Sequence, residues 1–321
     1  MENKILIFGH KNPDTDTICS SMVKQILNEK DGKTNTQAVR LGNVNKETQY
    51  VLDYLKIEAP ELIEGVKKGQ EVILIDHNEF SQSADGIEKA KIIGVIDHHR
   101  IANFQTTEPL YYTARPYGCT STILFKDFKQ KGIEIEKTEA ILMASAIISD
   151  TLLLKSPTTT SHDKEALEEL AKIANIDLDT YGIEMLKAGT DLDDFSEEEL
   201  INLDAKKFEE NGVKCVIAQV NTVSIEDVLK RKEKLEEAIN NEIEKDNLNL
   251  FVFAITDILN SNSQIIALGN RTDIIEKSYK LEDNMAFLKG VVSRKKQILP
   301  MVEKNAGLIK EAEHVWQNRE S

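Results

Sequence analysis

The chain has 321 residues, of which 40% are hydrophobic and 30% are charged. This length is sufficient for two domains, each with its own buried core. With 40 basic and 55 acidic residues the net charge is −15, which argues against a general nucleic-acid or anionic-membrane binder. The longest uninterrupted apolar run, Leu250 to Ile255, is far shorter than the roughly 20 residues of a membrane-spanning helix.

Strand-like and helix-like segments alternate in the first half of the chain. Apolar runs at 5–8, 72–75 and 92–96 predict buried strands. Helices are predicted to begin at Thr17 and, capped by Thr138, to run through 140–148, while 47–56 reads as helix or loop. This alternation is typical of βαβ units and predicts a mostly parallel, doubly wound α/β sheet.

The second half is predicted to be a smaller α/β domain. Helices at 161–174 and 179–188 lead into a small, acidic segment that predicts a linker. We therefore expect a first domain at 1–188, a hinge at 189–195 and a second domain at 196–321. Beyond the hinge the sequence predicts a capping box from Ser196 to Glu199, a hairpin turn at Asn211-Gly212, strands at 213–220, 248–255 and 264–268, and a charged helix at 224–245.

Histidines and aspartates gather immediately after the predicted strands of the first domain. They form four segments: His10-Lys11-Asn12-Pro13-Asp14-Thr15-Asp16, Asp76-His77-Asn78-Glu79, Asp97-His98-His99 and Ser149-Asp150-Thr151. The first three follow strands, and the fourth ends an apolar helix. Because the carboxyl ends of parallel strands form the ligand-binding edge of an open sheet, we expect these side chains to converge.

Converging carboxylates repel one another unless a cation neutralises them. Mixed carboxylate and imidazole ligands without thiolate favour Mn²⁺, Co²⁺ or Mg²⁺ over structural Zn²⁺. The ligands outnumber the needs of one ion, which predicts two ions roughly 3.5–4 Å apart, bridged by a carboxylate. Taken alone, the first segment is also compatible with a solvated acidic turn and the Asp97-His98-His99 segment with a polar strand end, while the other two segments are weak signals. The adjacent histidines His98 and His99 are expected to point in different directions.

These segments resemble the DHH phosphoesterase superfamily and, within it, the manganese-dependent family II inorganic pyrophosphatases. The run Ser293-Arg294-Lys295-Lys296-Gln297, which follows a strand-like stretch at 288–292, resembles the substrate-binding motif of that family. The resemblance extends from Ile5 to about Pro300. It implies a DHH fold with the active site in the cleft between the two domains.

The resemblance implies a role for each matching residue. His10 and Asp14 would ligate the first Mn²⁺, Asp16, His98 and Asp150 the second, and Asp76 both, with His77 and Asp97 orienting the ligands. His99, Lys206, Arg294 and Lys295 would bind the substrate and take part in catalysis, and Asp14 would accept the proton of the nucleophile. Co²⁺ is a possible substitute, and further Mg²⁺ would arrive with the substrate.

The expected reaction is hydrolysis of pyrophosphate to two phosphates by a hydroxide that bridges both metals. The alternatives are another DHH-type phosphoesterase, acting on polyphosphate, oligonucleotides or cyclic dinucleotides, and a non-catalytic metal-binding module. The resemblance further implies a homodimer through the N-terminal domain, with no nucleic-acid or membrane partner. Three scattered cysteines, Cys19, Cys119 and Cys215, are predicted to be reduced packing residues, and an N-terminus without a secretory segment predicts a cytoplasmic protein.

Overall fold

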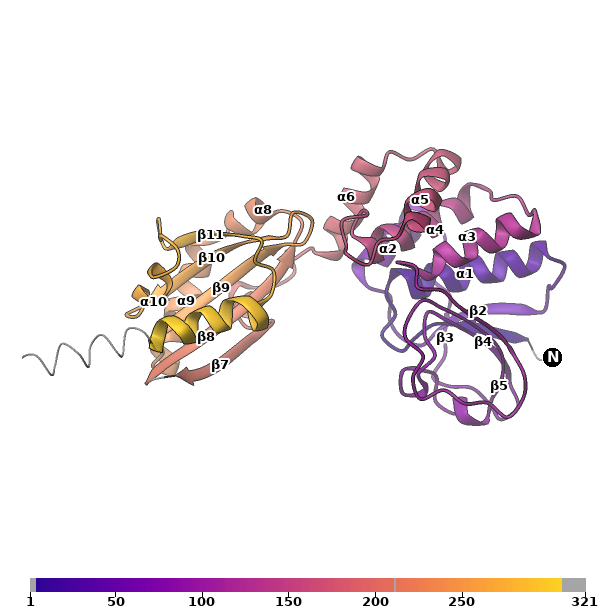
Figure 1. The fold of residues 1–321 in the computed structure, drawn as a ribbon, viewed down its shortest axis with the longest axis horizontal. Helices are drawn as coiled ribbons and strands as arrows, with labels where there is room; N and C mark the ends of the chain where they lie inside the picture. Colours follow the sequence, from indigo (N-terminus) through magenta and orange to yellow (C-terminus); the bar gives the residue numbers. More distant parts are fainter. Residues whose placement is uncertain (1–3, 211, 308–321) are drawn as a thin grey trace, which may run out of the picture. The chain divides into compact units, whose positions relative to one another are not determined.

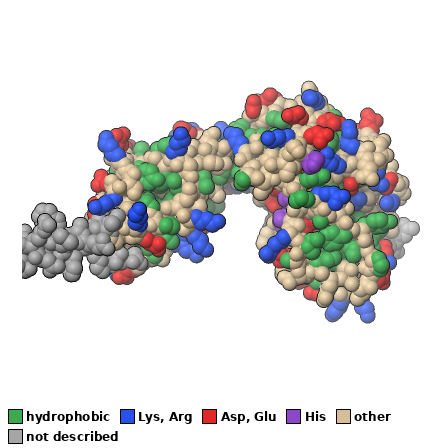
Figure 2. All heavy atoms as spheres, in the orientation of Figure 1, with side chains coloured by type: hydrophobic (Ala, Val, Ile, Leu, Met, Phe, Trp, Pro, Cys, Tyr) green, Lys and Arg blue, Asp and Glu red, His purple; other side chains and the backbone are tan. Residues whose placement is uncertain are grey.

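The computed structural model describes residues 4–210 and 212–307 (Figure 1). The chain divides into two compact units, Met1–Gly189 and Thr190–Ser321. Among the described helices, none combines the length and hydropathy that crossing a bilayer requires. Acidic and basic side chains are interspersed over the visible face of each unit (Figure 2).

A six-stranded, wholly parallel sheet forms the centre of the N-terminal unit. Its order is β3-β2-β1-β4-β5-β6, the order of a doubly wound sheet, as predicted. The strands are β1 (Ile5–Phe8), β2 (Thr36–Arg40), β3 (Glu61–Leu62), β4 (Glu71–Ile75), β5 (Lys91–Asp97) and β6 (Tyr111–Ala114). The apolar runs had predicted β1, β4 and β5, which lie together at the centre of the sheet.

Helices cover one face of this sheet (Figure 1). α1 (Thr15–Lys30) packs on β1 and β2 and against α3 (Thr120–Lys131) and α4 (Lys137–Thr151). α2 (Lys46–Leu55), α5 (Ser161–Ala174) and α6 (Leu178–Gly189) complete the unit. On the opposite face, strand residues such as Leu74 pack against Ala84 and Ile87, from the segment that holds the short 3₁₀ turns η1 (Phe80–Gln82) and η2 (Ile87–Lys89).

Two helix starts differ from the prediction. α1 begins at Thr15 rather than Thr17, because Asp14 is the N-cap residue and its Oδ1 accepts a hydrogen bond from the Thr17 backbone N–H at 2.9 Å. α4 begins at Lys137, after Glu136, so Thr138 is not its cap. The predicted helix at 161–174 is confirmed as α5.

The C-terminal unit contains a five-stranded mixed sheet in the order β11-β10-β9-β8-β7. Its strands are β7 (Ala205–Glu210), β8 (Val213–Thr222), β9 (Leu250–Asp257), β10 (Asn262–Gly269) and β11 (Met285–Lys289). Only the β8–β9 pair is parallel among these described strands. Antiparallel pairing of β7 with β8 confirms the predicted hairpin, and Gly212 turns it with φ of +80°. Asn211 lies outside the described residues.

Helices lie on both faces of the second sheet. The capping box at Ser196 and Glu199 is confirmed at the start of α7 (Glu197–Leu200). The predicted helix at 224–245 is in fact two helices, α8 (Ile225–Leu229) and α9 (Lys232–Asp246), separated near Arg231. The other face packs against α10 (Asp273–Glu276) and the segment that begins as a π-helix, η3 (Arg294–Ile298), and continues as an α-helix through 307.

Candidate active site

The polar segments of the N-terminal unit meet at the carboxyl edge of its sheet. His10 follows β1, Asp76 follows β4 and His98 follows β5. Because these three strands are neighbours and run parallel, the three residues lie at the same edge of the sheet. The start of α1 and the last turn of α4 reach the same place. The structure therefore brings together all six residues predicted as metal ligands, namely His10, Asp14, Asp16, Asp76, His98 and Asp150.

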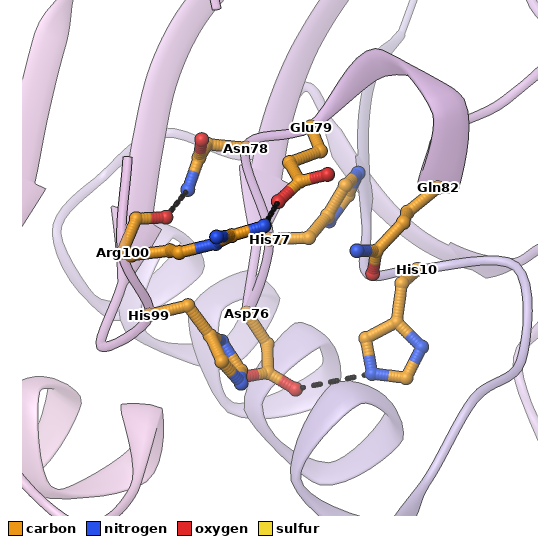
Figure 3. A pocket seen from close by; sticks show the side chains of 8 residues that line it. All are labelled: His10, Asp76, His77, Asn78, Glu79, Gln82, His99 and Arg100. Atoms are coloured by element: carbon orange, nitrogen blue, oxygen red, sulfur yellow. Dashed lines mark hydrogen bonds and ion pairs between the residues drawn. The ribbon is translucent and has the colours of Figure 1, made fainter. Parts of the chain in front are cut away.

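Asp76 contacts histidines of two different segments, and its carboxylate lies between His10 and His99 in Figure 3. Its φ of +60° is a left-handed conformation, which aspartate tolerates better than most residues. His10 Nε2 lies 3.5 Å from its Oδ2, and His98 Nε2 lies 3.3 Å from its Oδ1. The hydroxyls of Thr17 and Thr120 donate to Oδ2 and Oδ1 at 2.8 and 3.0 Å. Burial alone would raise the pKa of this carboxyl, but its bonds with the two histidines hold the pKa well below its ordinary value.

One oxygen of Asp76 faces a group formed with His10 and Asp14. His10 Nε2 lies 3.4 Å from Asp14 Oδ2, while Asp14 Oδ1 caps α1. Burial lowers the pKa of His10, but its hydrogen bonds with Asp14 and Asp76 outweigh burial and raise the pKa to about 10. Without a metal, the imidazole itself carries the positive charge that these carboxylates need.

The second acidic group comprises Asp16 and Asp150, beside His98. Asp16 is fully buried and accepts bonds from Ser20 Oγ at 2.5 Å and the Thr120 backbone N–H at 2.7 Å. Asp150 Oδ2 is buried and accepts no hydrogen bond from a described residue; His98 Nε2 lies 3.7 Å away. Burial and neighbouring carboxylates raise the pKa of Asp16 to about 6 and that of Asp150 well above its ordinary value.

This donor set fits a divalent metal ion. An unpartnered, buried carboxylate oxygen beside a second carboxylate is a position where a cation would replace repulsion with attraction. Carboxylate oxygens and imidazole nitrogens are the ligands that manganese accepts. The sulfur of Cys119 also lies near Asp16 and Asp150, but burial raises the pKa of this thiol well above its ordinary value, which disfavours a thiolate ligand. Cys119, like Cys19 and Cys215, is a buried free cysteine, as predicted.

The adjacent histidines His98 and His99 were predicted to point in different directions, but both rings face Asp76. His98 Nε2 and His99 Nδ1 lie 3.3 and 3.5 Å from the same oxygen, Asp76 Oδ1. β5 ends at Asp97, so the alternation of a strand no longer applies beyond it. Asp97 Oδ1 accepts from the His99 backbone N–H at 3.0 Å and lies 3.0 Å from His99 Nδ1, which turns the ring toward Asp76.

A cavity of about 230 Å³ opens beside this edge (Figure 3). His99 is 53% exposed and lines the cavity, whereas His98 is 14% exposed and does not, so of these two adjacent histidines His99 is the one that solutes in the cavity reach. The Asn78 side chain donates to Asp97 Oδ2 at 2.6 Å and so fixes the carboxylate that holds His99. The cavity is lined by His10, Asp76, His77, Asn78, Glu79, Gln82, His99 and Arg100.

The basic motif of the C-terminal unit is held at the start of η3. Arg294 Nη2 donates to Asp204 Oδ1 at 2.9 Å, and its backbone N–H donates to Gln219 Oε1 at 2.9 Å. The Gln219 backbone N–H in turn donates to the Asp204 carbonyl at 3.1 Å. The structure therefore brings Arg294 to the segment that carries Lys206, and both Lys206 and Lys295 are exposed. The predicted strand at 288–292 is wrong beyond Lys289, where β11 ends.

The hydroxyl groups that hold the buried carboxylates were not predicted from the sequence. Thr17 and Ser20 follow Asp16 by one and four residues on α1, so helical spacing could have located them. Thr120 bonds Asp16 and Asp76 from 104 and 44 residues away, and no local signal indicates that contact.

The fold and this cluster of donors define a metal-dependent phosphoesterase of the DHH type. Residues 4–147 match the model of the DHH family N-terminal domain, and residues 183–305 match the DHHA2 domain. The chain is 56% identical over 305 residues to a probable manganese-dependent inorganic pyrophosphatase of an Exiguobacterium species, covering 94% of this chain and 98% of that protein.

A second curated relative and a solved structure are also named as inorganic pyrophosphatases. The manganese-dependent inorganic pyrophosphatase of Bacillus subtilis is 55% identical over 302 residues, covering 93% of this chain and 97% of that protein. A crystal structure of a putative family II inorganic pyrophosphatase of Methanococcus jannaschii matches with a TM-score of 0.60 and 40% identity, covering 94% and 99% of the two chains. The chain belongs to the family of manganese-dependent, family II inorganic pyrophosphatases, which confirms the resemblance.

Proposed function

We propose that this chain hydrolyses inorganic pyrophosphate to two phosphates at a site that holds two manganese ions. The observation that carries the proposal is Asp76, a buried carboxylate whose two oxygens face different sets of histidines and aspartates. Family membership supplies the substrate, because the relatives at 55–56% identity are named as pyrophosphatases.

Each ion would be held by its own group of residues, with Asp76 shared. The first ion would bind to His10, Asp14 and Asp76, and the second to Asp16, Asp76, His98 and Asp150. When bound, the two ions would supply a hydroxide nucleophile at neutral pH and neutralise phosphate oxygens. We propose Mn²⁺ as the resident ion, with Co²⁺ as a substitute and further Mg²⁺ accompanying the substrate.

Asp14 would act as the proton acceptor and His99 as a hydrogen-bond donor during attack on the phosphorus. Asp14 would accept the proton of the nucleophile, since the Thr17 backbone N–H fixes one of its oxygens and leaves the other beside His10. His99 would donate a hydrogen bond to a phosphate oxygen. The bond between its ring and Asp97 raises the pKa of His99, which favours the protonated ring that can donate.

Lys206, Arg294 and Lys295 would bind the phosphate oxygens and neutralise the leaving phosphate. Asp204 holds the guanidinium of Arg294 beside the segment that carries Lys206, another of the proposed phosphate-binding residues. In this proposal residues 189–195 act as a hinge between domains 1–188 and 196–321, and closure brings these cations to the substrate at the metal ions.

A homodimer through the N-terminal domain and a cytoplasmic location complete the proposal. β6 is the edge strand of the first sheet, and Tyr111 at its start is 88% exposed. Ile101 in the preceding loop is 60% exposed. An exposed aromatic side chain on an edge strand, which pairs on one side only among the described strands, favours strand pairing with a second copy. Sedimentation of the full chain tests this, and a monomer at micromolar concentration would contradict it.

The decisive experiment is phosphate release by metal-stripped protein after Mn²⁺, Co²⁺, Mg²⁺ or Zn²⁺ is added back. Pyrophosphate, a polyphosphate and a short dinucleotide are compared as substrates. We expect pyrophosphate to be hydrolysed fastest, with Mn²⁺ or Co²⁺ restoring activity. Preference for polyphosphate or the dinucleotide would indicate another DHH-type phosphoesterase. No hydrolysis with any metal would indicate a metal-binding module without catalysis.

A further inference from the structure

Glu47, in the first turn of α2, is a partly buried carboxylate to which the proposed reaction assigns no role. Its Oε1 accepts two short hydrogen bonds, from Thr15 Oγ1 at 2.6 Å and from Ser149 Oγ at 2.5 Å. These donors come from different helices, 32 and 102 residues away in sequence. A single oxygen atom thus joins the start of α1 to the end of α4.

The two donors are the immediate neighbours of proposed metal ligands. Thr15 stands between Asp14 and Asp16, and Ser149 precedes Asp150. Asp14 belongs to the group around His10, while Asp16 and Asp150 form the second group, so the bonds of Glu47 reach the segments of both. Any shift between α1 and α4 that separates Asp16 from Asp150 would also have to break one of these bonds.

Gly189, the last residue of α6 and of the N-terminal unit, lies against the same side chain. A Cβ atom at this position would lie 2.9 Å from both Cβ and Oε2 of Glu47, closer than ordinary contact allows. The glycine therefore leaves room for the carboxylate at the point where the chain leaves the N-terminal unit.

We propose that Glu47 is a positioning residue of the metal centre, which holds the segments of Asp14, Asp16 and Asp150 at ligating distance. The inference rests on the proposed function, since it takes those aspartates as ligands. Removing groups that orient metal ligands costs about 10- to 100-fold in metal affinity or activity. A role only in stabilising α2, where a carboxylate in the first turn interacts favourably with the helix dipole, would lower stability without changing metal affinity.

The test measures the affinity of the metal-stripped, full-length chain for Mn²⁺. Binding is measured by calorimetry and by the electron paramagnetic resonance signal of free Mn²⁺. We expect Glu47→Ala to weaken binding of Mn²⁺ by about 10- to 100-fold. Glu47→Gln keeps a carbonyl oxygen that can accept both bonds, so we expect it to restore binding to within a few-fold of wild type. Ser149→Ala removes one bond and is expected to lie between wild type and Glu47→Ala.

Tyr50→Phe is the matched control on the same helix, because it removes a hydrogen bond of 2.9 Å to Glu184, which joins α2 to α6 and not to α1 or α4. We expect it to bind Mn²⁺ as wild type does. Wild-type affinity in both Glu47→Ala and Ser149→Ala, or equal weakening in Tyr50→Phe, would overturn the inference. Should Glu47→Ala fail to fold, Ser149→Ala decides. Failure of the wild-type chain to bind Mn²⁺ would instead overturn the proposed function.

Discussion

Replacing Asp76 with asparagine isolates the negative charge that the proposed site shares between two ions. Asparagine has the same shape and also tolerates the φ of +60° at this position. Thr17 and Thr120 can each donate or accept, so both hydroxyls keep a partner on the amide. Alanine would be a poorer test, since it leaves two buried hydroxyls unpaired, at about 1–3 kcal/mol each, and strains the backbone.

The expected effects on stability and on catalysis differ in size. In the metal-free chain, Asp76→Asn removes the charge that His10 and His98 face, which we expect to cost about 1.5–3 kcal/mol in the free energy of unfolding. In the metal-loaded chain it weakens a ligand of both ions. A loss of roughly 4 kcal/mol of transition-state stabilisation corresponds to about a 10³-fold fall in turnover.

Turnover and bound metal are measured on the same sample. Phosphate release is followed at saturating Mn²⁺, and the number of ions per chain is determined after desalting. Asp31→Asn serves as the control, because that carboxylate pairs with Lys131 away from the site. We expect the control to match wild type, and Asp76→Asn to lose bound Mn²⁺ and nearly all turnover. Two retained ions with near-normal turnover in Asp76→Asn would refute the shared-ligand assignment.

Three further predictions test other parts of the molecule. Lys295→Ala should lower kcat/KM by about 10- to 100-fold, through a higher KM and a lower kcat, while Mn²⁺ affinity stays constant; altered metal affinity alone would show that the residue serves the metal centre instead. The pKa values of His10 and His98 in the metal-free chain are raised to about 10 and about 9, so protons compete with the metal for these rings at neutral pH. The affinity for Mn²⁺ should therefore rise with pH through the neutral range, by up to about tenfold per pH unit for each proton released. An affinity independent of pH in calorimetric titrations would contradict this. Ser196→Ala removes the cap of α7 and should lower the free energy of unfolding in urea by about 1 kcal/mol, and an unchanged midpoint would show that this cap is not stabilising.

The sequence predicted the centre of the first sheet but not its edges. β1, β4 and β5 are uninterrupted apolar runs because helices or apolar loops cover both of their faces. β2 and β6 mix polar and apolar residues, and β3 has only two, so none of them carries that signal. The convergence of the acidic segments was nevertheless predictable, since it depends only on parallel strands ending at a common edge.

Contacts between distant segments account for the error in the predicted helix at 224–245. The predicted helix at 224–245 is interrupted near Arg231, whose guanidinium bonds Glu197 and the carbonyls of Leu192 and Phe195. Nothing in the periodicity of that segment indicates those partners. The error at the start of α1 has a local cause instead: Asp14 caps the helix as well as facing His10, so the helix begins at Thr15 and not at the predicted Thr17.

The buried, unpartnered oxygen of Asp150 and its acidic neighbours are a stronger physical argument for metal ions than the sequence motifs. Burial raises the pKa of Asp16 and of Asp150, and Asp150 Oδ2 accepts no hydrogen bond from any described residue. Hydroxyls and backbone N–H groups satisfy Asp16 and part of Asp76, so the fold does supply partners where it can. An isolated buried carboxylate oxygen is costly, and stable proteins concentrate such violations at functional sites. The carboxylates of Asp16 and Asp150 therefore lack positive charge close by at this edge of the sheet, and divalent ions bound there would supply it.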